Sequence, residues 1–73
     1  MDVTANQLKR VTKDWSSIAG EPVSVEQSGS FLFAYGTELA VLRLSAAFKE
    51  CKDATHKFSS NLNSWYFSKE LMC

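Results

Sequence analysis

The sequence has little of what catalytic and metal centres are built from. It contains one histidine and two cysteines, and its three glycines fall at the ends of predicted elements rather than in a phosphate-binding loop. Zinc needs three or four ligands at one site, and a general base needs a nucleophile and an orienting acid within reach. The histidine, His56, follows the second predicted helix without such partners, so we interpret it as an exposed loop residue. We therefore expect no metal site, no cofactor and no enzymatic activity.

Cysteine is scarce, and long hydrophobic runs are missing. Cys51 and Cys73 form no CxxC pair, and a secreted domain of this size usually carries more cysteines, so we expect two free thiols in a reducing compartment. Residues 1–4 have neither the basic nor the apolar part of a signal peptide. The longest uninterrupted apolar runs have four or five residues, whereas a membrane span needs about 20. The prediction is a soluble, cytoplasmic protein without membrane association.

An excess of charge of either sign is missing as well. Eight Lys and Arg balance eight Asp and Glu, and this net charge of zero removes the usual argument for binding nucleic acid or anionic membranes. Hydrophobic residues make up 45% of the chain and charged residues 22%, a composition that favours folding over disorder. The 73 residues can fill one hydrophobic core but not two, so we predict a single small domain over residues 1–73.

The first predicted helix covers residues 5–19. Thr4 followed by Gln7 is a capping box, in which each side chain satisfies a backbone N–H of the other residue. Gly20 stops the helix, and Pro22 prevents its resumption. The apolar stripe of this helix consists of Leu8, Val11, Trp15 and Ile18.

A hairpin follows, with Gly29 in its turn. Valines alternate with polar residues before the turn, and aromatic residues alternate with smaller ones after it. A two-residue loop at Ser28-Gly29 would place the aromatic side chains opposite polar ones, whereas a three-residue loop pairs Val25 with Phe31. We predict the three-residue loop with a left-handed Gly29, because it puts the five large side chains on one face. These are Val23, Val25, Phe31, Phe33 and Tyr35.

The second predicted helix runs from its N-cap, Thr37, to about residue 53. One apolar stripe faces the core, and a second, separate stripe lies among the charged residues. The core stripe comprises Val41, Leu44, Phe48 and Cys51, and the second stripe comprises Leu39, Leu42 and Ala46. The second stripe either packs against the first helix or is exposed, and the pattern favours neither alternative. If it is exposed, it predicts an interface to a foreign protein or to a second copy of the chain.

The last predicted strand covers residues 64–69, with Trp65 and Phe67 on one face and Tyr66 on the other. Residues 57–58 indicate a short additional strand only weakly. In the element order α-β-β-α-β, this last strand runs parallel to the second strand and antiparallel to the first. Pairing with the first strand gives a three-stranded antiparallel sheet of order 2-1-3. Both helices cover one face of the sheet, so the predicted fold is an α+β two-layer sandwich. Leu32, Ala34 and Tyr66 are then left on the open face.

A small basic patch on the first helix, Lys9, Arg10 and Lys13, supports an alternative function as a nucleic-acid-binding regulator. Proteins that bind single-stranded nucleic acid stack its bases on exposed aromatic rings and contact its phosphates with cations. The pattern places the aromatic side chains on the buried face, and acidic residues interrupt the cations. Nucleic acid is therefore the weaker of the two partner hypotheses.

Residues 33–44 (FAYGTELAVLRL) and residues 60–67 (SNLNSWYF) resemble segments of small orphan accessory proteins from enterobacterial tailed phages and prophages. The resemblance carries no functional motif. It implies a non-enzymatic role, because members of this class often bind and inhibit a host protein, including defence inhibitors of the anti-CRISPR kind. It also implies action in the host cytoplasm.

These observations predict a small accessory protein that binds a host or phage protein, with a homodimer through the second helix as another use of the same surface. The candidate protein-binding residues are Leu39, Leu42 and Ala46 on the second helix and Leu32 and Tyr66 on the open sheet face.

Overall fold

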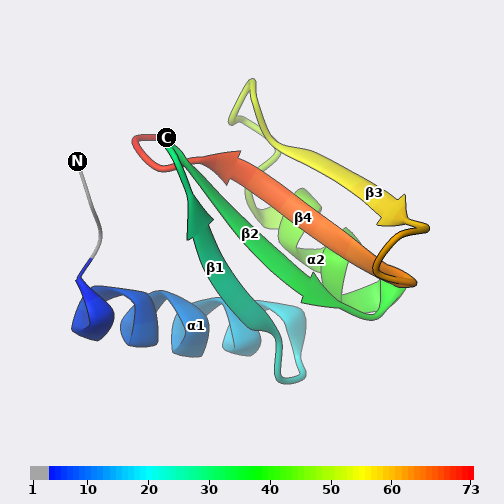
Figure 1. Cartoon of the computed structure of the whole chain (residues 1–73), viewed down its shortest axis with the longest axis horizontal. Helices are drawn as coiled ribbons and strands as arrows, with labels where there is room; N and C mark the ends of the chain where they lie inside the picture. The colour runs from blue at the N-terminus through cyan, green and yellow to red at the C-terminus, as the bar shows by residue number, and fades with distance from the viewer. Residues whose placement is uncertain (1–3) are drawn as a thin grey trace.

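The computed structural model describes residues 4–73, which form two helices and four strands (Figure 1). In chain order these are α1 (Ala5–Ala19), β1 (Ser24–Ser28), β2 (Phe31–Gly36), α2 (Glu38–Ala47), β3 (Thr55–Ser59) and β4 (Ser64–Glu70). Residues 1–3, on which part of the signal-peptide argument rests, lie outside the described residues. The predicted α+β class is confirmed.

The four strands form one antiparallel sheet in the order β1-β2-β4-β3. Both helices lie on one side of this sheet, with α1 beside β1 and α2 behind the other strands, and the opposite side is open (Figure 1). The predicted three-stranded sheet of order 2-1-3 is therefore wrong, because β4 pairs with β2 and not with β1.

The strand β3 causes this difference in strand order. Residues 55–59 pair with β4 through the turn at residues 60–63, so the chain reverses direction once more before β4 begins. Each reversal changes the orientation of the strands that follow. As a result, β4 runs antiparallel to β2, whereas the sequence pattern predicted a parallel orientation.

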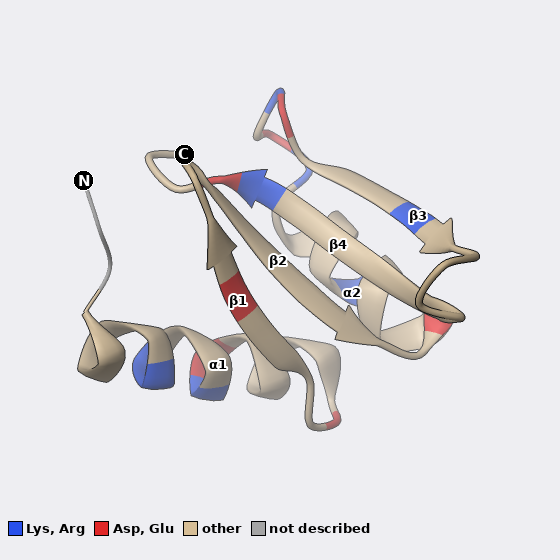
Figure 2. Ribbon diagram, in the orientation of Figure 1, with Lys and Arg blue, Asp and Glu red and all other residues tan. Residues whose placement is uncertain are grey.

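The helix α1 forms as its sequence predicts. The Gln7 N–H donates to Thr4 Oγ1 (3.2 Å) and the Thr4 N–H donates to Gln7 Oε1 (2.9 Å), which completes the capping box. Gly20 ends the helix with a φ of +76°, a conformation that glycine adopts without strain. The predicted apolar stripe is confirmed for Leu8, Val11 and Trp15 and is wrong for Ile18, which is 39% exposed; Ala19 faces the core in its place. The Lys and Arg residues of α1 (blue in Figure 2) are exposed, and Lys9 lines a shallow hollow between this helix and Val25 of β1.

The hairpin between β1 and β2 has a two-residue loop, Gly29-Ser30, and a register that differs from the predicted one. Val25 pairs with Ala34, whereas the predicted three-residue loop paired it with Phe31. Gly29 has the expected positive φ (+61°) and takes the first loop position, as type II′ turns require. The observed register turns Phe31, Phe33 and Tyr35 away from the helices and Leu32 and Ala34 towards them.

The helix α2 begins where predicted and ends early. The Ala40 N–H donates to Thr37 Oγ1 (3.2 Å), so the predicted N-cap is confirmed. The helix ends at Ala47, and not near residue 53. Residues 48–54 instead form turns, in which the Cys51 N–H donates to the Phe48 carbonyl. These turns carry the chain to the sheet edge where β3 begins, so tertiary pairing overrides local helix propensity.

The core lies between the sheet and the two helices. The rings of Trp15, Phe48 and Phe67 meet in it, with centroids 5.4–5.8 Å apart. Arg43 of α2 donates a hydrogen bond from Nη1 to the Ala19 carbonyl (2.9 Å). This bond satisfies one of the last carbonyls of α1 and ties the two helices together.

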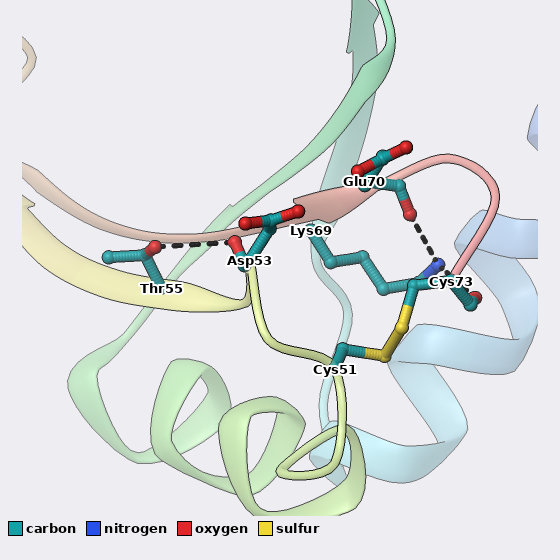
Figure 3. Close-up of a disulfide and its surroundings, with 6 residues drawn as sticks. All are labelled: Cys51, Asp53, Thr55, Lys69, Glu70 and Cys73. Carbon is teal, nitrogen blue, oxygen red and sulfur yellow. Dashed lines mark hydrogen bonds between the residues drawn. A yellow bond between two sulfur atoms is a disulfide. The ribbon is translucent and has the colours of Figure 1, made fainter.

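Cys51 and Cys73 are joined by a disulfide, so the prediction of two free thiols is wrong (Figure 3). Their Cα atoms are 5.9 Å apart, because the turn after α2 and the turn after β4 lie side by side. The C-terminal turn is held by Lys69 as well, whose Nζ donates to the carbonyls of Glu70 and Cys73, both at 3.0 Å. The part of the cytoplasmic prediction that depends on free thiols loses its support.

Candidate functional site

The open side of the sheet carries the clearest candidate for a functional surface. Directly opposite residues on neighbouring strands share a face, so the register defines rows of side chains across this side. The rows are Ser24-Tyr35-Tyr66-Lys57, Glu26-Phe33-Ser68-Thr55 and Ser28-Phe31-Glu70. The aromatic residues of these rows all stand on the two central strands, β2 and β4.

Three of the rings, Phe33, Tyr35 and Tyr66, form what we call the open-face cluster. The ring centroids are 6.5 Å apart for Phe33 and Tyr35, 5.9 Å for Phe33 and Tyr66, and 6.4 Å for Tyr35 and Tyr66. Each of the three side chains is half-buried. Because no described element covers this side of the sheet, the exposed part of each ring faces solvent. Contiguous exposed apolar surface of this kind marks a site of interaction.

A shallow hollow of about 360 Å³ adjoins one end of the open-face cluster. It lies between β1, the Tyr35 ring and the turn that joins β3 to β4. Its lining residues are Ser24, Glu26, Tyr35, Leu62 and Ser64. Leu62 is 59% exposed and supplies an apolar wall, while Glu26 supplies a carboxylate. Ligand pockets span roughly 300–1,000 Å³, so the hollow suits one side chain better than a large ligand.

The open side carries few charges, and they do not neutralise one another. Strand spacing places Glu26 and Lys57, on the two edge strands, about 15 Å apart, which is beyond the screening length at physiological salt. Within residues 4–73, no hydrogen bond or ion pair holds the Glu26 carboxylate. Burial raises the pKa of Tyr35, and the charge of Glu26 and the neighbouring Tyr66 raise it further. The surface at the hollow is therefore negative.

Three of the residues predicted to bind a partner are exposed on α2, and we call them the α2 stripe. Leu39 is 53% exposed, Leu42 is 42% exposed, and Ala46 is exposed as well. The alternative in which this stripe packs against α1 is therefore wrong. The α2 stripe lies on the helix side of the sheet and is separate from the open-face cluster.

The other two predicted binding residues have opposite outcomes. Tyr66 lies on the open face as predicted and belongs to the open-face cluster. Leu32 is only 3% exposed and belongs to the core, so its assignment to a binding surface is wrong. The sequence pattern missed Phe33 and Tyr35, because the wrong hairpin register buried them. A glycine followed by serine is a known pair for two-residue hairpin loops, and this signal at Gly29-Ser30 would have found them.

The basic patch of Lys9, Arg10 and Lys13 is exposed on α1, which packs against the edge strand β1, whereas the open-face cluster stands on the central strands β2 and β4. The structure therefore does not bring it together with the open-face cluster. The prediction that aromatic rings are too buried to stack on bases is nevertheless wrong for Phe33 and Tyr35.

His56 is exposed as predicted, although it lies in β3 and not in a loop. Its Nδ1 is 3.1 Å from Ser45 Oγ, and no acidic side chain among the described residues bonds to it. Within residues 4–73, no three His, Cys, Asp or Glu side chains are grouped to hold a metal ion. In the same part of the chain, no helix has the length and apolar character needed to cross a membrane.

Comparison with family models, with curated proteins and with solved structures finds no match for this chain.

Proposed function

We propose that this chain is a small non-enzymatic accessory protein that binds another protein through the open side of its sheet. The observation that carries the proposal is the open-face cluster, in which Phe33, Tyr35 and Tyr66 contact one another and are only half-buried. Aromatic residues are enriched at the centres of protein interfaces, where they bury a large area in well-packed pockets. The resemblance to phage and prophage accessory proteins supports a host protein as the partner.

Single-stranded nucleic acid is the alternative partner, and the open-face cluster favours it in one respect. RNA-recognition domains stack bases on aromatic rings of a four-stranded sheet. Binding of a phosphate backbone also needs cations around the rings. The open side carries two acidic residues, Glu26 and Glu70, and one cation, Lys57, while the cations of α1 stand on a helix beside the edge strand β1 and not among the rings of β2 and β4. A protein partner is therefore better supported.

Capture of partners from an enterobacterial lysate with two matched variants tests the proposal. Phe33→Ser removes one ring of the open-face cluster, which contacts both of the others, and Leu42→Glu alters the α2 stripe on the helix side of the sheet. We expect a partner that wild type and Leu42→Glu retain and Phe33→Ser loses, with circular dichroism confirming that both variants fold. The reverse result would move the binding site to the α2 stripe. A partner that nuclease treatment removes would make nucleic acid the ligand.

The α2 stripe offers a second candidate interface, at which two copies of the chain would form a homodimer. A two-fold pairing of α2 helices buries the same patch twice, and each exposed leucine contributes about 1.5–3 kcal/mol when fully buried. Leu42→Glu should then dissociate the dimer and leave the monomer folded, because Leu42 is already 42% exposed. Sedimentation of wild type and variant measures this. Wild type that sediments as a monomer would exclude the homodimer.

A further inference from the structure

The hollow beside Tyr35 combines groups that together recognise a cation. Glu26 brings a carboxylate that no hydrogen bond or ion pair holds within residues 4–73. Tyr35 offers the face of its ring, and Ser24 and Ser64 add hydroxyl groups. A carboxylate accepts strong hydrogen bonds from a cation, and an aromatic face attracts a cation through its quadrupole. An apolar group placed there would strip water from the carboxylate without replacing it.

We propose that this hollow is a specificity pocket for an arginine side chain of the protein partner. The inference rests on the proposed function and goes beyond it by naming the chemistry of the partner segment. Arginine fits better than lysine, because its planar guanidinium can stack on the Tyr35 ring while two of its N–H groups reach the Glu26 carboxylate. Leu62 forms an apolar wall for the methylene groups of the same side chain.

The charges around the hollow single out this end of the open side. Burial is the larger cause of the raised pKa of Tyr35, and the charge of Glu26 raises this pKa further. The field of the Glu26 carboxylate therefore reaches the ring that the guanidinium would cover. Glu70, the other acidic residue of the open side, pairs with Phe31, and strand spacing puts it about 13 Å along the sheet from Tyr35. Glu70 lines no part of the hollow, which makes it a matched control for Glu26.

An NMR titration of the full ¹⁵N-labelled chain with two short peptides tests the pocket. The first probe is a glycine–arginine–glycine peptide with blocked ends, and the second carries citrulline, which has nearly the shape of arginine without its charge. We expect the arginine peptide at millimolar concentration to shift the amide signals of Ser24, Glu26, Tyr35 and Ser64 in a saturable way, and the citrulline peptide to leave them in place. Glu26→Gln should weaken binding of the arginine peptide about tenfold, and Glu70→Gln should leave it unchanged.

Two results would overturn the pocket: equal shifts with both peptides, or unchanged binding of the arginine peptide in Glu26→Gln. The capture experiment separates this failure from failure of the proposed function. A partner that Phe33→Ser loses and Glu26→Gln retains leaves the open side as the binding surface and removes only the arginine pocket. A partner that Phe33→Ser retains removes the open side itself. If an oligonucleotide shifts these amide signals and the arginine peptide does not, both the arginine pocket and the proposed protein partner are overturned.

Discussion

Opening the disulfide between Cys51 and Cys73 should destabilise the protein by about 3 kcal/mol. The bond joins residues that are 22 positions apart in the sequence. In the chain-entropy description, a loop of this length lowers the entropy of the unfolded chain by about 11 cal/mol/K, which is about 3 kcal/mol at 25 °C. Small domains are stable by roughly 0.05–0.15 kcal/mol per residue, or about 4–11 kcal/mol for a chain of 73 residues. The disulfide therefore supplies a large share of the total.

Urea unfolding followed by circular dichroism measures the difference. Oxidised wild type is compared with Cys51→Ser, with Cys73→Ser and with reduced wild type, all of which open the same loop and should lose a similar free energy. At about 4–8 °C per kcal/mol for a chain of this size, the melting temperature should fall by about 12–24 °C. Reductant should leave the two serine variants unchanged, which controls for its other effects.

The folded state should change little when the bond opens, because the C-terminal turn has other attachments. The Leu71 N–H donates to the Ser30 carbonyl at 2.7 Å, and Lys69 Nζ donates to the Cys73 carbonyl at 3.0 Å. Amide spectra of the oxidised and reduced protein should therefore differ only near the two cysteines. Equal unfolding midpoints for the two forms, or two titratable thiols after air oxidation, would refute the reasoning.

Four further predictions concern the glycines of positive φ and the hollow. Gly29→Ala should cost on the order of 1 kcal/mol from left-handed strain alone, since no atom outside residues 28–30 lies within 4 Å of the added Cβ. Gly20→Ala should cost more, because its Cβ also collides with the Arg43 guanidinium; urea unfolding of the two variants compares them, and equal costs would show that Arg43 moves aside freely. Wild type should lose stability relative to Tyr35→Phe as pH rises above about 10 through the folded pKa of Tyr35. The raised pKa lets the folded chain keep a proton that the unfolded chain loses in this range. The comparison with Tyr35→Phe also removes the effect of Lys69, which is the same in both proteins. Burial lowers the pKa of Lys69, so its contribution to stability rises with pH and does not fall. Glu26→Gln should lower the pKa of Tyr35, read from phenolate absorbance in a Tyr66→Phe background, and an unchanged pKa would contradict the placement of Glu26 beside the ring.

The starts of both helices could be predicted from the sequence because capping depends on near neighbours. Thr4 and Thr37 each accept a hydrogen bond from a backbone N–H three residues later, and this spacing is visible in the sequence. The end of α2 depends instead on contacts far along the chain. Cys51 leaves the helical path to meet Cys73, and no local signal marks that contact.

The strand β3 was hard to recognise because it shows no alternation of buried and exposed residues. The first four residues of Thr55–Ser59 are all exposed, including Phe58 on the helix side, which is 49% exposed. An edge strand with little burial on either face gives no period-two pattern for a sequence to reveal. Its pairing with β4 nevertheless decides the order of the whole sheet.

The hairpin register decides the core and the candidate binding surface together. Val25 pairs three residues further along β2 than predicted, and because three is an odd number, every side chain of β2 changes face. The space under the helices explains why the small residues face inward. A Cβ on Gly36 would lie 3.2 Å from Val23 Cγ1 and 3.6 Å from the Ala40 Cβ, so this end of β2 has no room for large side chains on the helix side.

Volume, rather than hydrophobicity, therefore sorts the side chains of β2. Trp15, Phe48 and Phe67 already fill the middle of the core with rings whose centroids lie 5.4–5.8 Å apart, and the aromatic residues of β2 exceed what that core can hold. They are placed on the open side, where Phe33 and Tyr35 meet Tyr66 from β4. A pattern of alternating apolar residues marks both faces of such a strand in the same way. Only the pairing of the strands distinguishes the face that builds the core from the face that is left for a partner.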